Sequence, residues 1–440
     1  MDEANEKLEK VLRGLKTINL TVEAPIELLV EVDALDAFIK DLQQAEQESF
    51  DVVIVQPITF TDARFIRKVV ELISAPILIW SVREPYANGG RLCLNSLTGA
   101  NLYAQELRPL RQFALVHGDP GEEDVLIDVR RKCLALGLSG NLAKQTVLAL
   151  GEAPDGFFFS DISVLEIAHL GIKFKNLPLN SVFEASKRLE DTEIMAEKEF
   201  IRNRIEGVAE DTPELLSSAK ILRVVRQMIQ EQGASLVTTR CWPDYFTQAG
   251  VAPCSIVSLL NDEGIPTSCE RDVLGAISMY MLAKLSNQPA FLGDLVHLDD
   301  KLNTLTFWHC GAGAPSLAGR SGAKAGVHPN RKIGISLEME AKSGPVTVIR
   351  LGLDAGKLRL LIMEGWAKDG PQKFLGTCID VVPGEISGRG WMNKVMTLGY
   401  EPHYAVGYGH WADVLKEWGS LIGIEVNCSE PKGEERSSLN

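Results

Sequence analysis

The fold class is decided by residues 235–294, SLVTTRCWPDYFTQAGVAPCSIVSLLNDEGIPTSCERDVLGAISMYMLAKLSNQPAFLGD. Two helical patterns, at 253–261 and 271–285, alternate in this stretch with three short apolar runs. The runs are SLVTTR at 235–240, IPTSC at 265–269 and AFLGDL at 290–295. Strands separated by helices of this length are typical of a parallel sheet with crossover helices. We therefore expect a βαβαβ unit here.

A second α/β region precedes this unit. The runs DVVIVQ at 51–56 and PILIWSV at 76–82 flank a helical pattern at 62–73, which predicts a βαβ unit. Alternation continues to about residue 155, with strand-like runs at 113–116 and 146–150. The strand ends carry neither a GxGxxG nor a GxxxxGK[ST] motif. Nucleotide binding is therefore not supported.

After residue 303 the pattern changes to strands and turns. Runs at 347–353 and 358–363 are joined through Asp354, Ala355 and Gly356, which predicts a hairpin. The expected fold class is α/β, with two doubly wound parallel-sheet domains followed by a mainly β, barrel-like C-terminal domain. The expected boundaries give an N-terminal α/β domain at 1–155, a central α/β domain at 156–303 and the mainly β domain at 304–440.

Length and charge exclude several classes of protein. At 440 residues the chain is long enough for two or three domains, and 45% hydrophobic with 24% charged residues is ordinary for a folded protein. Lysine plus arginine number 45 against 59 aspartates plus glutamates, which gives a net charge of −14. This acidic balance argues against nucleic acid and against an anionic membrane surface as partners.

Targeting and membrane segments are not expected. The most apolar stretch, 69–82, is interrupted by Glu71 and Pro76 and is too short to span a bilayer. The charged start, MDEANEK at 1–7, lacks the basic and apolar regions of a signal peptide. Eight cysteines are scattered without a CxxC pair, which is typical of reduced thiols. We therefore expect a cytoplasmic protein.

Three polar residues follow the three strands of the central unit. Arg240 ends the first strand, Glu270 the second and Asp294 the third. Ligands of an open parallel sheet collect beyond the carboxyl ends of its strands, and the 24 residues from Glu270 to Asp294 match one strand–helix–strand repeat. The two carboxylates should therefore lie side by side. Because such a pair repels unless a cation lies between, the pattern predicts a divalent metal that can polarise a carbonyl.

The same acids also have a structural interpretation, because aspartate and glutamate cap helix N-termini and occupy surface loops. A histidine ligand would have to come from elsewhere in the chain. His309, His403 and His410 lie at a strand end or beside the strand-like run 404–406. Spacing alone does not choose among the three, and each can equally be a structural histidine.

Further side chains offer substrate contacts. The small-residue loop GAGAPSLAGRSGAKAG at 311–326 carries Arg320 and Lys324 and is either an anion clamp or a mobile connection. Trp242 follows Arg240 and either stacks on a sugar ring or covers the core from a turn. The sequence does not decide between the two roles of the loop or between the two roles of Trp242.

The run GIPTSCERDVLGAISMYMLAKLSNQPAFLGD at 264–294 resembles the L-fucose isomerase and L-arabinose isomerase superfamily. Four more segments resemble the superfamily and extend the similarity over about residues 235–425. They are TTRCWPD at 238–244, FWHCGAGAPSL at 307–317, IMEGW at 362–366 and PHYAVGYGH at 402–410. The chain departs from typical L-fucose isomerases in being shorter and in lacking several of their recognisable sugar-contacting positions.

The resemblance implies a catalytic Mn²⁺, or another divalent metal, held by Glu270, Asp294 and His403. Glu270 and Asp294 match the metal-binding carboxylates of the superfamily and are also the implied catalytic residues. His403 matches its ligand histidine, which precedes the final strand and helix. His309 matches a strand-end histidine and is either a fourth ligand or a substrate contact. The expected substrate contacts are Arg240, Trp242 and His309.

The implied activity is that of an intramolecular oxidoreductase, an aldose–ketose isomerase acting on an open-chain sugar of the L-fucose or L-arabinose type through a cis-enediol. The metal would bind the oxygens on C1 and C2, while Glu270 and Asp294 relay a proton, one as base and the other as acid. The resemblance also implies a homo-oligomer, a trimer or hexamer, in which a neighbouring subunit completes the site.

Two alternatives stay open. In the first, the chemistry is the same and the substrate is an aldohexose with an anionic group at C6, such as a sulfonated hexose of the sulfoquinovose type, held by Arg240, Arg320 or Lys324. In the second, the chain is a non-catalytic sugar-binding protein built on the same α/β layers. Such a protein would need neither Glu270 nor Asp294, so the joint presence of both acids favours the enzyme.

Overall fold

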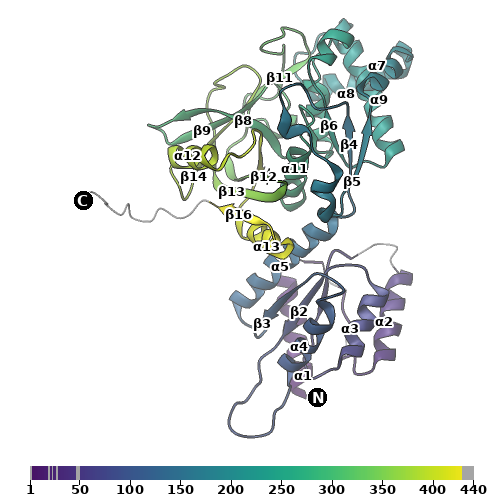
Figure 1. The fold of residues 1–440 in the computed structure, drawn as a ribbon, viewed down its shortest axis with the longest axis vertical. Coiled ribbons are helices and arrows are strands. Elements are labelled where there is room, and N and C mark those ends of the chain that lie inside the picture. Colours follow the sequence, from purple (N-terminus) through teal and green to yellow (C-terminus); the bar gives the residue numbers. More distant parts are fainter. Residues whose placement is uncertain (1, 18–19, 22, 26–27, 46–49, 429–440) are drawn as a thin grey trace, which may run out of the picture. The chain divides into compact units, whose positions relative to one another are not determined.

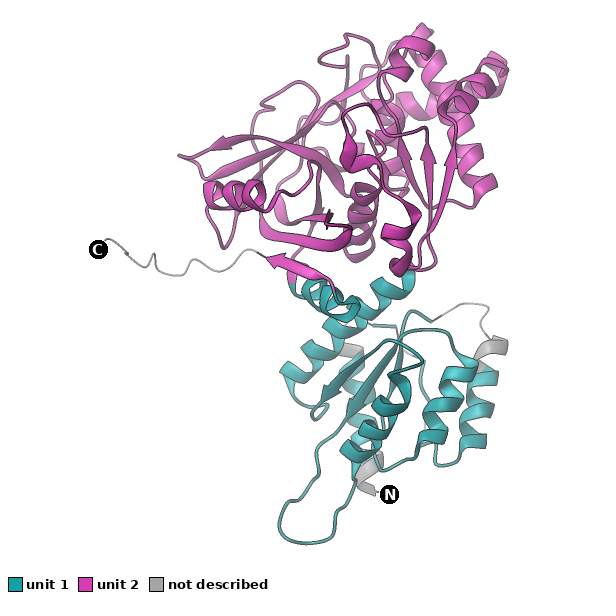
Figure 2. Ribbon diagram, in the orientation of Figure 1, with its two compact units in different colours: residues 1–141, 413–423 teal, residues 142–412, 424–440 magenta. Residues whose placement is uncertain are grey.

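The computed structural model describes residues 2–17, 20–21, 23–25, 28–45 and 50–428. The chain divides into two compact units, which have different colours in Figure 2. Unit 1 contains residues 1–141 and 413–423, and unit 2 contains residues 142–412 and 424–440.

Unit 1 is a doubly wound α/β unit around a three-stranded parallel sheet (Figure 1). The strands pair in the order β1 (Val53–Val55), β2 (Ile77–Ser81) and β3 (Phe113–His117). The helices are α1 (Asp2–Thr17), α2 (Val32–Ala45), α3 (Ala63–Leu72), α4 (Ser96–Leu107), α5 (Glu123–Leu142) and most of α13 (Ala412–Ile422). The predicted βαβ unit at 51–82 is confirmed.

Alternate residues of β2 face two different cores. Leu78 and Trp80 pack in a buried cluster with α1, β3 and α5, whereas Ile77 and Ile79 pack in another with α2, α3 and α4. Successive side chains of a strand point to opposite faces of the sheet, so helices must cover both faces. This double covering explains why the run PILIWSV is continuously apolar.

Unit 2 begins with a four-stranded parallel sheet of order β5-β4-β6-β7. Its strands are β4 (Thr146–Leu150), β5 (Lys173–Leu177), β6 (Leu236–Thr239) and β7 (Thr267–Ser268). The accompanying helices are α6 (Val164–Ile167), α7 (Leu179–Lys187), α8 (Met195–Arg204), α9 (Pro213–Gln232), α10 (Cys254–Asp262) and α11 (Val273–Ser286). Within the described ranges of the chain, no helix is both long and apolar enough to cross a membrane.

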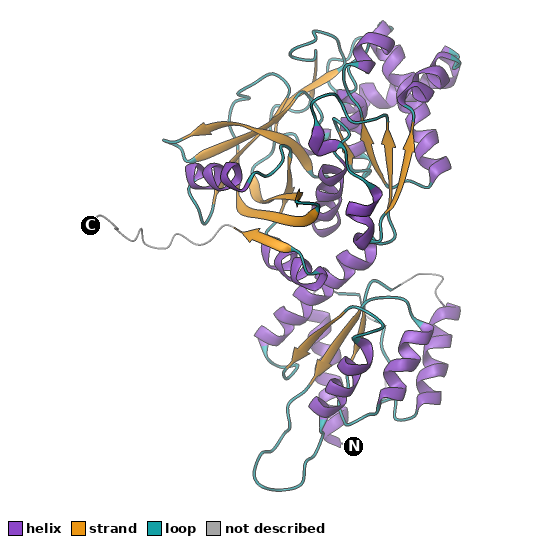
Figure 3. Ribbon diagram, in the orientation of Figure 1, coloured by secondary structure: helices purple, strands orange, loops and turns teal. Residues whose placement is uncertain are grey.

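A nine-stranded mixed sheet forms the rest of unit 2 (Figure 3). Its strands run in the order β10-β11-β14-β9-β8-β15-β12-β13-β16. Their bounds are β8 (Phe291–Asp299), β9 (Thr304–His309), β10 (Lys324–Gly326), β11 (Ser336–Glu340), β12 (Gly344–Asp354), β13 (Lys357–Lys368), β14 (Thr377–Pro383), β15 (Tyr404–Tyr408) and β16 (Glu425–Cys428), with helix α12 (Gly388–Leu398). Because β13 also pairs with β14, the six strands β14, β9, β8, β15, β12 and β13 close into a ring. The predicted fold class is therefore confirmed.

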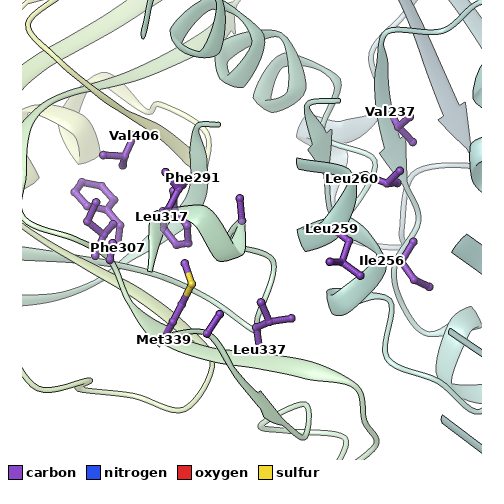
Figure 4. Packing of buried hydrophobic residues seen from close by; sticks show 14 of the residues in the cluster. Val237, Ile256, Leu259, Leu260, Phe291, Phe307, Leu317, Leu337, Met339 and Val406 are labelled. Atoms are coloured by element: carbon purple, nitrogen blue, oxygen red, sulfur yellow. The ribbon is translucent and has the colours of Figure 1, made fainter. Parts of the chain in front are cut away.

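The two sheets of unit 2 share one hydrophobic core. A single cluster of buried side chains contains Val237 of β6 and Leu260 of α10 together with Phe291, Phe307 and Met339 of the large sheet (Figure 4). Burial of this apolar surface stabilises both sheets at once and fixes them against each other within the unit. The ends of β7 and of the ring strands can thus hold one site between them.

Two segments join different sheets from those expected. Residues 146–150, assigned by pattern to the N-terminal domain, form β4 in the middle of the parallel sheet of unit 2. Residues 290–295, expected as the third parallel strand of the central unit, begin β8, which is antiparallel to β15 and β9. A strand after a helix can return parallel to the previous strand or start a hairpin, and the apolar pattern is the same in both cases. The domain boundaries at 155 and 303 stay a prediction.

Candidate metal centre

Glu270 and Arg271 lie in a strained turn directly after β7. Their φ angles are +55° and +56°, in the left-handed region that costs a residue other than glycine free energy. The backbone N–H of Arg271 donates to the carbonyl of Thr239 at 3.0 Å. Its buried guanidinium donates to the carbonyls of Gly151 and Ser160, each at 2.9 Å. The carboxyl ends of β4 and β6 thereby fix the position of Glu270.

Asp272 caps α11 and also reaches the histidine that precedes β15. One of its carboxylate oxygens accepts the N–H of Gly275 at 2.8 Å, the usual N-cap arrangement. The other oxygen lies 3.0 Å from Nδ1 of His403 and accepts a hydrogen bond from Arg350. The side chains of Asp272 and Arg350 are fully buried, so each charge compensates the other inside the core.

His403 is held in one orientation by its backbone and by its ring. Its φ is +70°, again in the left-handed region, and its carbonyl accepts a hydrogen bond from Arg350 at 3.2 Å. The Asp272 carboxylate accepts a hydrogen bond from Nδ1 of the ring, which fixes the orientation of the imidazole. In this orientation the other ring nitrogen, Nε2, lies 2.7 Å from Oε2 of Glu270. The ring of Phe159 packs edge-on against the imidazole, with 5.6 Å between centroids.

The strands β8 and β9 bring Asp294 and His309 to the same place. β15 pairs with β8 at Gly293, and Oδ1 of Asp294 lies 3.7 Å from Nε2 of His403. β9 pairs with β8 at Asp294, so the end of β9 lies alongside. The ring of His309 is buried, and its centroid is 5.6 Å from that of His403. The expectation that Glu270 and Asp294 lie close together holds, although their strands belong to different sheets.

Glu270, His309 and His403 form a cluster of potential metal ligands, the metal-ligand cluster. One potential ligand atom of each residue lies within 4.8 Å of the others, and Asp294 adjoins the cluster through His403. Nδ1 of His309 accepts the backbone N–H of Cys310 at 2.9 Å. In the neutral ring this hydrogen bond puts the proton on Nε2, which then acts as a donor.

Burial and hydrogen bonds shift the pKa values in the cluster. Burial disfavours the charged ring of His403, but hydrogen bonds with Asp272 and Glu270 outweigh it and hold the pKa well above its usual value. Burial tends to raise the pKa of Glu270, and the hydrogen bond and charge of His403 lower it below its usual value. Against the effect of burial, Arg350 and His403 lower the pKa of Asp272 to about 2. Burial lowers the pKa of His309.

These donors fit a divalent cation. Imidazole nitrogen together with carboxylate oxygen suits ions such as Mn²⁺ or Zn²⁺. A proton on Nε2 of His403 and a metal ion compete for the same lone pair, so a site that attracts one positive charge also attracts the other. The hydrogen bond from Nδ1 of His403 to the buried carboxylate of Asp272 is the arrangement that orients metal-binding histidines.

Arg240 and Trp242 lie at the carboxyl end of β6, as expected. Nε of Arg240 donates to Asp244 at 2.7 Å, and Nη1 donates to the carbonyl of Ala153 at 3.0 Å. The ring of Trp242 packs edge-on against Phe157, with 5.9 Å between centroids. The roles of both residues as substrate contacts stay a prediction.

Three other candidates lie away from the cluster. The side chain of Arg320 is 91% exposed and lies 3.7 Å from the carboxylate of Asp369, and Lys324 is exposed in β10. His410 is exposed, with Nδ1 3.4 Å from the carboxylate of Glu364. In the part of the chain that the structure describes, none of the three has a hydrogen bond or ion pair with the metal-ligand cluster. Of the three candidate histidines, His403 and His309 lie in the metal-ligand cluster.

Sequence reasoning missed Asp272, Arg350 and Phe159. Asp272 lies at the start of the helical pattern 271–285, so its N-cap role has a sequence signal. Arg350 is the single charge in the apolar run VTVIRLGL at 346–353, and a charge buried in a strand requires a partner. Phe159 has no comparable signal, because its contact with His403 depends on the packing of a loop.

Comparisons with known proteins cover the whole site. Residues 328–429 match the family described as L-fucose isomerase, C-terminal domain. A curated protein named sulfoquinovose isomerase, from Priestia aryabhattai, is 37% identical over 422 residues, which are 95% of this chain and 94% of that protein. Proteins of the same name from Alkalicoccus urumqiensis and Clostridium sp. (strain MSTE9) are 35% and 34% identical over 92% and 98% of this chain, and over 90% and 96% of their own lengths.

Proposed function

The chain belongs to the L-fucose isomerase-like family, together with the sulfoquinovose isomerases, and on this premise we propose that it converts the sulfonated aldohexose sulfoquinovose into the corresponding 2-ketose. It is an aldose–ketose isomerase, so the predicted enzyme class is confirmed in place of the non-catalytic alternative. The names of the relatives favour the anionic substrate over a neutral one. A neutral sugar of the L-fucose type is the second candidate, because residues 328–429 match the L-fucose isomerase domain.

We assign the divalent metal of this family, which we propose is Mn²⁺, to Glu270, Asp294 and His403. When bound, such an ion is a Lewis acid that polarises the sugar carbonyl and stabilises negative charge on the oxygens at C1 and C2. The observation that carries the assignment is the convergence of both carboxylates on Nε2 of His403, at 2.7 and 3.7 Å. His309 lies in the same cluster, and its Nε2–H supports a role as a donor to a sugar oxygen.

Glu270 and Asp294 move the protons of the reaction. Isomerisation through a cis-enediol requires that a proton leaves C2 and reaches C1, and that another passes between the oxygens O2 and O1. Glu270 is ionised at neutral pH, because His403 holds its pKa below the usual value, so its carboxylate has a lone pair that can accept a proton. The two carboxylates approach the same nitrogen from β7 and β8, so we propose that one serves the carbons and the other the oxygens.

Asp272 and Arg350 are positioning residues. Neither has a side chain exposed to solvent, and both act on the site through His403, one at its ring and one at its carbonyl. The hydrogen bond between Nδ1 of His403 and Asp272 keeps Nε2 in the orientation that a metal or a proton transfer requires.

We also propose a homo-oligomer, a trimer or hexamer, in the cytoplasm. Phe158 and Leu165 belong to the segment that carries Phe159 against His403, and their exposed fractions are 87% and 85%. We propose that a second copy of the chain covers these two apolar side chains beside the site. No disulfide occurs among the described cysteines, which supports a reducing compartment.

The test is an assay for ketose formation with Mn²⁺ and three sugars, namely sulfoquinovose, glucose 6-phosphate and L-fucose. Three proteins are compared: the wild type, Glu270→Gln and Glu231→Gln, the last being an exposed carboxylate on α9. We expect the wild type and Glu231→Gln to convert sulfoquinovose, and Glu270→Gln to lose about 10²–10⁴-fold in kcat. Chelation should abolish the wild-type activity and added Mn²⁺ should restore it.

Other outcomes reassign the function or the site. If the protein converts L-fucose and neither anionic sugar, its substrate is a neutral sugar of the L-fucose type, the second candidate. Full activity of Glu270→Gln would remove Glu270 from the site.

A further inference from the structure

One cation near the site was not a candidate in the sequence. The guanidinium carbon of Arg331 lies 5.5 Å from the ring centroid of Trp242 and 5.9 Å from that of Phe246. Cation–π contacts hold a guanidinium in place and leave its N–H donors available. Among the described residues, the guanidinium of Arg331 has neither an acidic partner nor a hydrogen-bond acceptor.

The turn that carries Arg331 is organised by His328. The backbone N–H groups of Asn330 and Arg331 donate to Nδ1 of His328 at 3.3 and 3.2 Å. The N–H of Lys332 donates to the carbonyl of His328 at 2.9 Å. The imidazole is nearly buried and packs edge-on against Phe246, with 4.9 Å between centroids. Arg331 is therefore presented by a preformed turn.

A row of aromatic rings connects Arg331 with the metal-ligand cluster. Trp242 packs against Phe157 at 5.9 Å, Phe157 against Phe159 at 5.8 Å, and Phe159 against His403 at 5.6 Å, each between ring centroids. All of these residues belong to unit 2. Arg331 and the cluster thus lie at the two ends of one aromatic wall.

The charges around His328 agree with this placement. Burial lowers the pKa of His328 to about 4, and the positive charge of Arg331 also lowers it. Because its ring is neutral near pH 7, the positive charge at this end of the wall comes from Arg331.

We propose that the guanidinium of Arg331 binds the anionic group at C6 of the substrate, an inference that rests on the proposed function and names its specificity residue. In this proposal C1 and C2 of an open-chain hexose lie at the metal-ligand cluster, and its C6 end follows the aromatic wall towards Arg331. The planar fork of arginine pairs with two oxygens of a sulfonate or phosphate at once. The cations expected from the sequence are less suitable, because Arg240 already pairs with Asp244 and Arg320 lies exposed beside Asp369.

The experiment compares Arg331→Met and Arg331→Lys with the wild type and with Arg320→Met, an exposed arginine that serves as the matched control. KM and kcat are measured for sulfoquinovose and for glucose, which has a neutral group at C6. We expect Arg331→Met to raise KM for sulfoquinovose about 10- to 100-fold, with a smaller change in kcat and none in KM for glucose. Arg331→Lys should be intermediate, and Arg320→Met should match the wild type.

Mn²⁺ affinity and the unfolding midpoint should not change in Arg331→Met, because the side chain is exposed and has no acidic partner among the described residues. An unchanged KM for sulfoquinovose, or equal losses with both sugars, would overturn the inference and leave the proposed function in place. A wild type that converts only neutral sugars would overturn both. If the wild type prefers a C6 phosphate to a sulfonate, the same loss in Arg331→Met with the phosphorylated sugar would support the assignment of the anion site and correct the substrate.

Discussion

His403 is the residue on which the site depends, because its Nε2 can hold either a proton or a metal ion. Its raised pKa means that the ring keeps a proton to a higher pH than a free histidine does, whose pKa is about 6.5. A metal ion must displace that proton at any pH below the raised pKa. The metal affinity of the protein is thus linked to pH through one imidazole.

We predict that the apparent affinity for Mn²⁺ rises with pH as long as the pH is below the raised pKa of His403, and levels off once His403 is neutral without the metal. Calorimetric titration between about pH 6 and pH 9 measures this dependence. His403→Gln should bind Mn²⁺ weakly and lose the dependence, while His410→Gln, which changes an exposed histidine, should keep both the affinity and the dependence. A wild-type affinity that is constant across this range would contradict the assignment of His403 as a ligand.

The residue types of the site could be read from the sequence, but their partners could not. Glu270 and His309 lie at the carboxyl ends of β7 and β9, where ligands collect, whereas His403 precedes β15 and Asp294, expected at a strand end, lies inside β8; the structure brings the four together. The Asp272 carboxylate that orients His403 lies 131 residues away from it in sequence. No spacing rule covers such a separation, because it depends on how two sheets pack.

At the level of elements, the first turn of α11 determines where the Asp272 carboxylate points. Gly275 is the residue whose N–H that carboxylate accepts. A Cβ at Gly275 would lie 2.4 Å from Oδ2 of Asp272, which also contacts His403 and Arg350. A glycine inside a helix usually costs about 1 kcal/mol relative to alanine. Alanine at position 275 would therefore favour the helix, but its Cβ would crowd the Asp272 carboxylate and oppose this stabilisation.

We predict that Gly275→Ala lowers both the unfolding midpoint and the Mn²⁺ affinity, because the displaced carboxylate loses Arg350 or His403. The matched control is Gly137→Ala in α5, where a Cβ would make only ordinary contacts at 3.7 Å. This control should leave the Mn²⁺ affinity unchanged and stabilise the protein by up to about 1 kcal/mol. Thermal unfolding and metal titration of both variants provide the comparison. A stabilised Gly275→Ala variant with full metal affinity would show that the carboxylate can move without loss.

The hairpin between β12 and β13 was predicted correctly, because its turn residues are a local signal in the sequence. The turn at Asp354–Gly356 joins β12 and β13, and its φ angles are positive at both Ala355 (47°) and Gly356 (76°), as a two-residue hairpin turn of type I′ requires. Helix α9 also has local signals at both ends, because Thr212 accepts the N–H of Leu215 at its start and Gly233 ends it with a φ of 57°. The pairing of β8 was not predictable in this way, because its partner β15 lies more than a hundred residues further along the chain.

At the scale of the whole molecule, the exposed segment around Phe158 and Leu165 predicts self-association. We expect Phe158→Ser combined with Leu165→Ser to shift the protein towards smaller species in analytical ultracentrifugation. Activity should fall with assembly, because the segment also carries Phe159 against His403. The control is Met396→Ser, which changes another exposed apolar residue, 64% exposed on α12. An unchanged sedimentation profile of the double variant would exclude this surface from the assembly.

The sequence by itself determined the α/β class, the mainly β C-terminal region, the acidic surface charge and the residues able to bind a metal. These follow from hydrophobic periodicity, turn residues and residue chemistry, which act over a few neighbouring positions. Only the tertiary structure decided that Asp294 reaches His403 from an antiparallel strand, that Arg350 neutralises Asp272, and that Arg331 lies over Trp242. These contacts join distant segments, and they arise from the burial of shared apolar surface between two sheets, which no local pattern specifies.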